Sequence, residues 1–287
     1  MSVQSRLESV GVKLCSDIAE LKLECTILEP TPGFSRVPPA LVAQANPLVS
    51  CLMMTRGNIE LMKYSLACYQ RQTYTNRELV VVAEPEAGEK VRNFIASQQV
   101  LSASVFVPPP GLTLGDHRNL AAARARGEIL VCWDDDDLSD PRRLDITVSI
   151  LRQTGVAAVF LSRFLIWWPQ RKVAAISGLN KWEPTIGVWR SYTPIYAPLP
   201  RGGDTPAIRG LISTHRVALI DCPLLYVYAV TGRNTWNSPH FEEQLATAEC
   251  LFEGDQFDEI NELLADRLPV LDYAAELSQE SVGKVLG

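Results

Sequence analysis

Between residues 48 and 151 the chain alternates between two hydrophobic patterns. One is a run of consecutive apolar residues, typical of a strand covered on both faces, and it occurs at 48–54, 78–83, 103–107 and 128–133. The other spaces apolar residues three or four positions apart, as in amphipathic helices, at 58–69, 87–97, 114–126 and 140–151. This alternation predicts an α/β fold with a mostly parallel sheet built by right-handed crossovers and flanked by helices.

Capping residues support these helices. Asn58 is expected to cap the first helix, Gly127 to end the third, and Asp140 with Pro141 to begin the fourth. We therefore expect each helix to stop before the next strand begins.

The pattern is looser outside this region. Residues 1–29 carry a helical stripe, and prolines between 30 and 47 indicate a linker. The stripe consists of Leu7, Val10, Leu14, Ile18 and Leu21. After 155 we expect a strand at 156–166, an irregular segment at 170–210 rich in Trp, Tyr, Pro and Gly, and further helix and strand segments at 215–220 and 224–230. The tail from 241 to 287 reads as amphipathic helix that Pro269 interrupts.

Composition narrows the class of protein. The 287 residues carry a net charge of −6, which argues against a nucleic-acid groove, because such a groove needs a basic stripe. The seven cysteines form no C-x-x-C pair, which favours a reduced, cytoplasmic protein. The start of the chain does not resemble a secretory signal, and the longest apolar stretch, 156–168, is too short to span a bilayer.

Four consecutive aspartates, Asp134 to Asp137, follow the fourth predicted strand. Adjacent carboxylates repel one another, and a divalent cation offsets that repulsion. Carboxylate oxygens select hard ions such as Mg²⁺ or Mn²⁺. Because open α/β sheets bind ligands at the carboxyl ends of their strands, the sequence predicts a metal-assisted reaction on a phosphorylated substrate there. The alternative is a solvated acidic turn without a metal.

Several other acidic motifs fit less well. A calcium loop needs glycine at its sixth position and glutamate at its twelfth, and counting from Asp134 or Asp135 gives neither. Asp136, Asp137 and Asp140 match the D-D-x-x-D motif of prenyl-diphosphate synthases, but that motif lies on a helix in an all-helical fold, whereas an apolar strand leads into it here. A phosphoaspartyl hydrolase would want Thr or Val at Leu138 or Ser139. P-loop and dinucleotide fingerprints are absent.

Residues 48–141 resemble a glycosyltransferase of the GT-A fold, of the inverting family 2 kind that uses nucleotide sugars. The likeness lies in four ordered segments: Pro47 to Asn58, Glu78 to Glu84, Gly111 to Leu130 with its His117-Arg118-Asn119, and Trp133 to Pro141. The resemblance implies an N-terminal helix and linker at 1–46, a GT-A catalytic domain at 47–240, and a helical tail at 241–287. Within that domain, 47–141 would be the nucleotide-binding half and 142–240 the acceptor half.

The resemblance also assigns roles in the nucleotide-binding half. Asp136 would bind the metal directly, Asp134 would bind the metal and face the ribose or donor sugar, and Asp135 lies between them. Asp137 would support them. Residues that would border the nucleotide are Thr55, Asn58, Glu84, Arg118 and Asn119, with Arg118 on the base or diphosphate side. For each of these, an ordinary capping, surface or salt-bridging role is the alternative.

The acceptor half matches less closely. Gly202-Gly203-Asp204 resembles the family's Gly-Glu-Asp, which makes Asp204 the expected catalytic base and Asp221 the fallback. Related chains often carry a histidine where Thr231 stands, and His240 is a possible replacement. Trp182, Trp189 and Tyr192 would offer flat faces to sugar rings or fill the core.

The expected function is sugar transfer from a nucleoside-diphosphate sugar, of the UDP-sugar type, to a glycan or other hydroxyl acceptor. Mn²⁺ or Mg²⁺ would be the cofactor. Two alternatives stay open: a sugar-nucleotide pyrophosphorylase, which would release pyrophosphate, and an impaired module that binds nucleotide or glycan without turnover. The changes at Gly203 and Thr231 keep the second alternative open.

Overall fold

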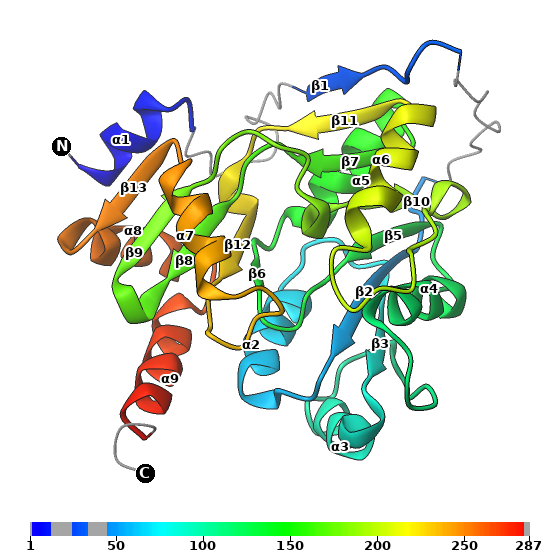
Figure 1. Ribbon diagram of the computed structural model, residues 1–287, viewed down its shortest axis with the longest axis horizontal. Coiled ribbons are helices and arrows are strands. Elements are labelled where there is room, and N and C mark those ends of the chain that lie inside the picture. Colours follow the sequence, from blue (N-terminus) through cyan, green and yellow to red (C-terminus); the bar gives the residue numbers. More distant parts are fainter. Residues whose placement is uncertain (1, 13–24, 34–44, 284–287) are drawn as a thin grey trace.

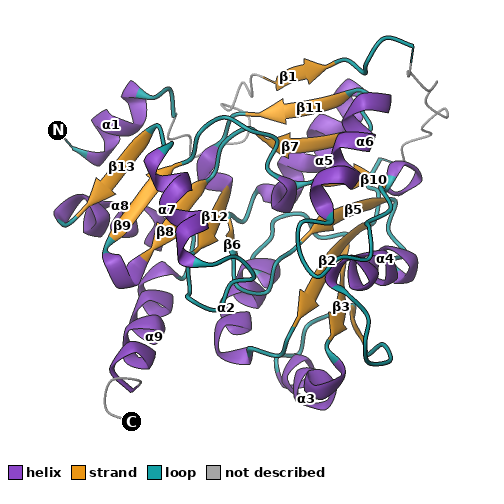
Figure 2. Ribbon diagram, in the orientation of Figure 1, coloured by secondary structure: helices purple, strands orange, loops and turns teal. Residues whose placement is uncertain are grey.

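The computed structural model describes residues 2–12, 25–33 and 45–283. They form two β-sheets with helices packed around both, which confirms the predicted α/β class (Figures 1 and 2). The larger sheet has eight strands and the smaller has five. Figure 1 shows helices α1 and α9 on the side of the smaller sheet.

The larger sheet contains the predicted parallel core. Its strands, in spatial order, are β1 (Cys25–Leu28), β11 (Val217–Ile220), β7 (Ala158–Leu161), β10 (Gly187–Trp189), β5 (Ile129–Cys132), β2 (Val49–Thr55), β3 (Arg77–Ala83) and β4 (Ala103–Phe106). Strands β5, β2, β3 and β4 run parallel, as do β7 and β11. Strand β10 lies antiparallel between β5 and β7 and joins the two parallel groups.

Helices lie in the connections between strands of the larger sheet. They are α2 (Ile59–Gln70), α3 (Gly88–Ser97), α4 (Leu114–Arg124), α5 (Arg143–Thr154) and α6 (Asp204–Thr214). Helix α4 packs on β2 and β3, and α5 packs on β7, β10 and β11. A capping box fixes the start of α4, because the Thr113 hydroxyl accepts from the Asp116 N–H while the Asp116 carboxylate accepts from the Thr113 N–H.

The smaller sheet is mainly antiparallel. Its strands, in spatial order, are β13 (Cys250–Glu253), β9 (Val173–Ile176), β8 (Leu165–Trp168), β12 (Tyr226–Ala229) and β6 (Leu138–Ser139). The helices near it are α1 (Val3–Ser9), α7 (Ser238–Ala246), α8 (Asp255–Ala265) and α9 (Val270–Gly283). Single-turn 3₁₀ helices are η1 (Pro85–Ala87), η2 (Pro169–Arg171), η3 (Glu183–Thr185), η4 (Arg190–Tyr192) and η5 (Pro223–Leu225).

Several predicted elements differ from the structure. The helix expected over 1–29 is wrong in part: residues 3–9 are helical, but 25–28 form edge strand β1, whose register with β11 pairs Cys25 with Ile220. Leu14, Ile18 and Leu21 lie outside the described residues. The single strand expected at 156–166 is two strands, β7 and β8, which belong to different sheets. The tail contains strand β13 because Cys250 and Phe252 alternate inward. The domain boundaries proposed above stay a prediction.

Two predicted caps also differ. Asn58 occupies the position before α2, but its side chain makes no capping hydrogen bond. Helix α5 begins at Arg143, two residues beyond Pro141, and Asp140 instead accepts from the N–H of Arg142.

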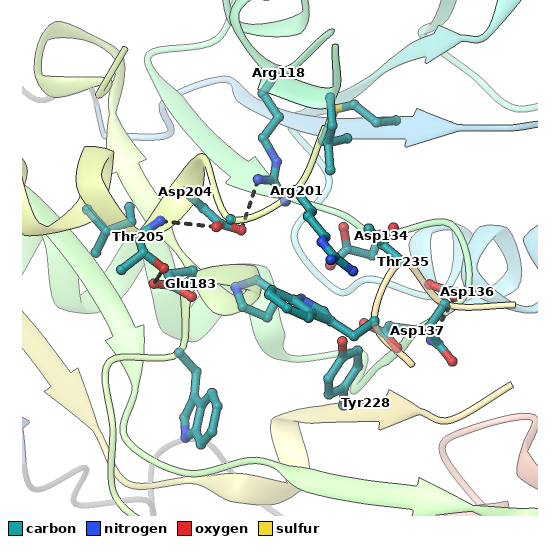
Figure 3. A pocket seen from close by; sticks show the side chains of 18 of the residues that line it. Arg118, Asp134, Asp136, Asp137, Glu183, Arg201, Asp204, Thr205, Tyr228 and Thr235 are labelled. Atoms are coloured by element: carbon teal, nitrogen blue, oxygen red, sulfur yellow. Dashed lines mark hydrogen bonds and ion pairs between the residues drawn. The ribbon is translucent and has the colours of Figure 1, made fainter. Parts of the chain in front are cut away.

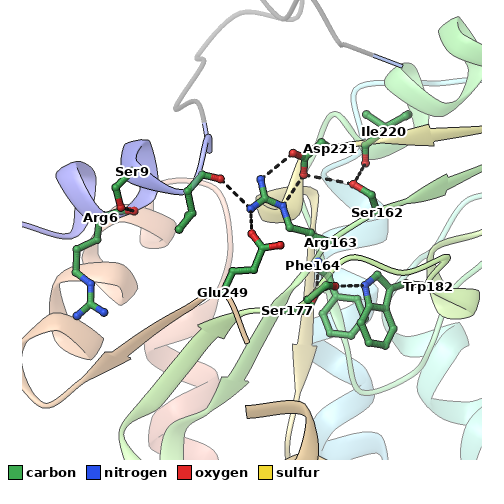
Figure 4. A network of polar contacts seen from close by, with 12 residues as sticks. Arg6, Ser9, Ser162, Arg163, Phe164, Ser177, Trp182, Ile220, Asp221 and Glu249 are labelled. Atoms are coloured by element: carbon green, nitrogen blue, oxygen red, sulfur yellow. Dashed lines mark hydrogen bonds and ion pairs between the residues drawn. The ribbon is translucent and has the colours of Figure 1, made fainter. Parts of the chain in front are cut away.

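Arg163, in the turn between β7 and β8, links the two sheets to the N-terminal segment (Figure 4). Its guanidinium pairs with Asp221 at 2.7 Å and with Glu249 at 2.5 Å, and donates to the Val10 carbonyl at 2.8 Å. The side chain is only 3% exposed, so its charge is satisfied inside the fold. Of the helices in the described residues, none is long and apolar enough to span a membrane.

Candidate active site

A cavity of about 790 Å³ opens at the carboxyl ends of β2, β3 and β5. Its opposite wall comes from the 180–184 segment, from α6 and from the loop between β12 and α7. A volume of this size fits a nucleotide sugar, and the position is where open α/β sheets bind ligands.

The aspartate run follows β5, and its residues are held in different ways. Asp135 accepts from the Thr55 hydroxyl at 2.5 Å, and Asp134 accepts from the Tyr226 hydroxyl at 3.0 Å. Asp137 is 3% exposed and is bonded to the Tyr226 hydroxyl and the Ala229 N–H, so both its oxygens are used inside the protein. These bonds fix the loop in front of the sheet.

Asp136 is held by residues distant in sequence. The Asn234 side-chain amide donates to its carboxylate at 3.1 Å, and the Tyr273 hydroxyl donates to its backbone carbonyl at 2.7 Å. Asn234 comes from the loop after β12 and Tyr273 from α9. Three separated parts of the chain therefore meet at this residue.

Burial, and then repulsion by neighbouring carboxylates, makes the charged forms of Asp135, Asp136 and Asp137 unfavourable. Burial, together with the negative charge of Asp134, raises the pKa of Asp135 to about 6, although its bond from Thr55 acts in the opposite direction. Burial and the neighbouring aspartates raise the pKa of Asp136 and Asp137 well above the usual range. An added divalent cation would reverse the balance.

The donor set suits a hard cation that arrives with phosphates. Within the described ranges, no three His, Cys, Asp or Glu side chains converge on one point, so an all-protein metal cage is not present there. Mg²⁺-type sites that hold nucleotides use one or two carboxylates and take other oxygens from the phosphates and water. Asp134 and Asp136 both line the cavity and fit that requirement.

The nucleotide-side residues divide into two groups. Thr55, Glu84 and Arg118 line the cavity, as the sequence-based roles require. Asn58 and Asn119 are outside the cavity lining: Asn58 accepts from the Arg233 guanidinium at 2.8 Å, and the Asn119 amide exchanges two 2.9 Å hydrogen bonds with the backbone of Tyr196. In this structure both side-chain amides form hydrogen bonds with other residues of the chain and do not face the cavity.

A second acidic group lies across the cavity (Figure 3). Asp204, the first residue of α6, pairs with Arg118 at 2.9 Å and accepts from the Thr205 N–H at 3.0 Å. Glu183 accepts from the Thr205 hydroxyl at 3.0 Å. Sequence reasoning missed Glu183, because nothing in its local pattern shows that η3 brings it beside α6. Asp221, the fallback base, is bonded to Arg163 and is not among the residues that line the cavity.

Aromatic side chains also line the cavity. They are Phe164, Trp182, Tyr228 and Trp236. Of the three aromatic residues singled out from sequence, Trp182 lines the cavity, whereas Trp189 and Tyr192 are buried in the core at 4% and 8% exposure.

Trp236 contacts two other side chains. Arg201 stands over its ring at 5.5 Å, and His240 stacks on it at 4.6 Å with an interplanar angle of 21°. Arg201 extends into the cavity (Figure 3) and forms no ion pair with any described carboxylate.

Thr231 offers no ring nitrogen to the cavity. Its hydroxyl accepts from the Arg233 N–H at 3.1 Å and donates to Asn234 at 3.2 Å, so it braces the loop after β12. His240 does line the cavity, but burial lowers the pKa of its imidazole, which favours a neutral ring. Asn234, which contacts Asp136, has no counterpart in the sequence-based expectations.

The fold thus places one cavity, with the acidic loop in its wall, at the carboxyl edge of the larger sheet. Residues 50–190 match the family described as Glycosyl transferase family 2, just under half of the chain. The chain is thus family 2-like in sequence and GT-A in fold, which confirms the resemblance.

Solved structures share the fold at low sequence identity. One is S. aureus TarS 1-349 in complex with UDP-GlcNAc, with a TM-score of 0.55, 15% identity, and 66% of this chain and 60% of that chain covered. Another is a mannosyltransferase from Pyrobaculum calidifontis in complex with GDP-Man and Mn²⁺, with a TM-score of 0.52, 16% identity, and coverage of 77% and 65%. This chain therefore spans less than two thirds of either structure. No curated protein sequence matches significantly.

Proposed function

We propose that this chain is a metal-dependent glycosyltransferase that moves a sugar from a nucleoside-diphosphate sugar to an acceptor hydroxyl with inversion. One observation carries the proposal: a single cavity has a metal-type acidic pair, Asp134 and Asp136, on one wall and carboxyl groups suited to proton transfer on the other. Inversion needs these two functions on opposite sides of the reacting sugar.

The donor would lie along the carboxyl edge of β2, β3 and β5. Thr55 and Glu84 would contact the nucleoside, with Glu84 accepting from a uracil-type N–H, and Asp135 would orient Thr55 through their hydrogen bond. Asp136 and Asp134 would hold Mn²⁺ or Mg²⁺, which supplies charge neutralisation for the diphosphate. The nucleotide sugars bound in the two solved structures support a donor of this class, and UDP is our choice of nucleotide.

The leaving diphosphate needs positive charge on the protein as well. Arg118 and Arg201 both line the cavity, and a guanidinium can bind phosphate oxygens through paired hydrogen bonds. The acceptor hydroxyl would approach from the α6 side, where the resemblance assigns proton removal to Asp204. Its oxygen would attack the anomeric carbon as the bond to the diphosphate breaks.

The acceptor would be a glycan or another hydroxyl compound. The exposed part of Trp236 and the ring of Trp182 offer flat surfaces for sugar rings. The cysteines in the described part of the chain are unpaired, which supports a reducing compartment such as the cytoplasm.

A thermal-shift experiment tests the donor site. UDP, GDP, UDP-GlcNAc and GDP-mannose are added to the full chain with and without Mn²⁺. We expect at least one of them to raise Tm by a few degrees when Mn²⁺ is present, because a ligand that binds only the folded state stabilises it. Asp136→Ala should abolish that shift.

Asp258→Ala is the matched control, because it removes an exposed carboxylate whose ion-pair partner among the described residues is Lys172. It should leave the shift unchanged. No shift with any of the four nucleotides in the presence of Mn²⁺ would refute the proposal. Binding without release of nucleoside diphosphate from any donor would favour the alternative of a module without turnover. That alternative is suggested by Thr231, which stands where related chains often carry a histidine.

A further inference from the structure

Two carboxyl groups stand on the acceptor side of the cavity, and only one is paired with a cation. Asp204 Oδ2 pairs with Arg118 at 2.9 Å, and its Oδ1 accepts from the Thr205 N–H at 3.0 Å. Glu183 accepts one hydrogen bond, from the Thr205 hydroxyl, and forms no ion pair with any described lysine or arginine. The same threonine thus contacts two acids in different surroundings.

The contacts of Asp204 use both of its oxygens. The Arg118 guanidinium stays protonated. Because its side chain is 15% exposed, the ion pair is partly shielded from water. Asp204 also begins α6, where the free N–H groups of the first turn attract negative charge. An acceptor hydroxyl would have to displace one of these contacts to give its proton to Asp204.

Glu183 has one oxygen that accepts no hydrogen bond from a described residue, and its pKa lies above that of an ordinary glutamate. Burial raises the pKa of its carboxyl, and the negative charge of Asp204 raises it further. The Thr205 hydrogen bond and the charges of Arg118 and Arg209 oppose that rise without cancelling it. A carboxyl whose pKa lies closer to neutrality takes up a proton more effectively during a reaction.

The backbone around Glu183 is held firmly. The Thr185 N–H and hydroxyl both donate to the Trp182 carbonyl, at 3.0 and 2.6 Å, and the Pro184 carbonyl accepts from Arg143 at 3.1 Å. The Trp182 ring packs on Phe164 at 4.3 Å. Glu183 is therefore presented to the cavity from a fixed 3₁₀ turn, as a proton-accepting group should be.

We infer that Glu183 is the general base of the transfer, and that Asp204 and Thr205 position it and the acceptor. The inference rests on the proposed sugar transfer. In the step, the acceptor O–H gives its proton to the free oxygen of Glu183 while its oxygen forms a bond to the anomeric carbon. The bond from that carbon to the diphosphate oxygen breaks, and its electron pair leaves with the nucleoside diphosphate.

The protonation of Glu183 can be measured without turnover. We would titrate the full chain, with its glutamate carboxyl carbons labelled with ¹³C, by NMR in the presence of UDP and Mg²⁺. The Glu183 signal is the one absent from Glu183→Gln. It should titrate above an ordinary glutamate, about 4.3, and shift downward in Asp204→Asn, where the neighbouring negative charge is gone. A titration at or below the ordinary value would overturn the inference.

Kinetics supply the second measurement. Hydrolysis of UDP-GlcNAc, UDP-glucose and GDP-mannose with Mn²⁺ is followed through release of UDP or GDP, with water as the acceptor. Glu183→Gln keeps the acceptor oxygen for Thr205, so donor KM should not change. Its kcat should fall by about 100-fold or more, and the acidic limb of the pH profile should disappear. Asp204→Asn should keep that limb and move it to lower pH.

The outcomes separate this inference from the proposed function. An acidic limb that survives in Glu183→Gln but vanishes in Asp204→Asn would assign the base to Asp204 and overturn the inference. Failure of the wild type to bind any nucleotide would reject sugar transfer itself. If nucleotides bind but none of the three donors is hydrolysed, the NMR titration alone decides.

Discussion

At the scale of single residues, Glu78 shows how a buried carboxylate can serve structure alone. It is the second residue of β3 and is 2% exposed. Its Oε1 accepts from the Ser50 hydroxyl and the Arg126 N–H, both at 2.6 Å, and its Oε2 accepts from the Arg126 side chain at 2.7 Å. The Ser50 hydroxyl in turn accepts from the Gly127 N–H at 2.8 Å. One carboxylate therefore joins β2, β3 and the turn that leads into β5.

We expect Glu78→Gln to lower the free energy of unfolding by about 1–3 kcal/mol, because an amide cannot accept at both of its ends. Burial raises the pKa of Glu78, but the hydrogen bonds from Ser50 and Arg126 outweigh it and the net pKa is lowered. The ionised group therefore stabilises the fold above the ordinary glutamate pKa, and this contribution is lost as pH falls through the lowered value. Urea unfolding between about pH 7 and pH 3 should show a smaller pH dependence in the variant.

The control for Glu78 is Glu262→Gln, an exposed change beyond the first turns of α8, which should behave like the wild type in these measurements. Equal behaviour of the two variants would contradict the structural role given to Glu78.

At the scale of elements, β10 is the strand that joins the two parallel groups of the larger sheet. It has three residues and pairs antiparallel with β5 on one side and β7 on the other. Gly187 allows close packing there, because a Cβ at this position would lie 2.2 Å from Thr147 Cγ2 in α5. The helix can approach the sheet at this point only because the side chain is absent.

Gly187→Ala should destabilise the protein by about 1–3 kcal/mol through overpacking against α5, measured as the change in unfolding free energy. Gly210→Ala is the matched variant, since a Cβ there meets nothing within 4 Å and the residue lies inside α6. It should be neutral or stabilising by about 1 kcal/mol, as expected for alanine in a helix. A Gly187 variant as stable as the wild type would show that α5 can move away freely.

The sequence revealed some elements and not others for a physical reason. Strands β2 and β3 are seven residues each and are buried on both faces, so their apolar runs are unmistakable. Strands β10 and β6 have three and two residues, too few to show a period of two. Edge strand β1 sits in a segment whose apolar spacing also fits a helix, and its pairing with β11 is decided by contacts almost two hundred residues away.

The same reasoning separates the site residues. Asp134 to Asp137 could be predicted because the run is local and follows a recognisable strand. Glu183 and Asn234 could not, because each acquires its place only when remote segments pack together. Local patterns carry no information about such pairings.

At the scale of the whole molecule, α9 is joined to the cavity rather than standing apart from it. Tyr273 is fully buried, stacks on Tyr64 of α2 at 4.5 Å and donates to the Asp136 carbonyl at 2.7 Å. Lys63 of α2 pairs with Glu276 of α9 at 2.7 Å. The position of the acidic loop therefore depends on a helix near the end of the described chain.

Tyr273→Phe should reduce the affinity for UDP with Mn²⁺, because it removes the hydroxyl that holds the Asp136 backbone, and should cost about 1–3 kcal/mol of stability. Calorimetric titration and urea unfolding measure the two effects. Tyr74→Phe is the control: it removes a similar buried bond, 2.6 Å from the Tyr74 hydroxyl to the Pro47 carbonyl, at the amino ends of β2 and β3 and so at the opposite end of these strands from the acidic loop. The control should lose stability but keep its affinity. Equal affinities in both variants would contradict a role of α9 in the site.

The hydroxyl of Tyr273 has one further consequence. A hydrogen bond of this kind weakens within a few tenths of an ångström, so a small slide of α9 is enough to release the main chain of Asp136. Any displacement of α9 would thereby change the geometry of the acidic loop without a ligand entering the cavity.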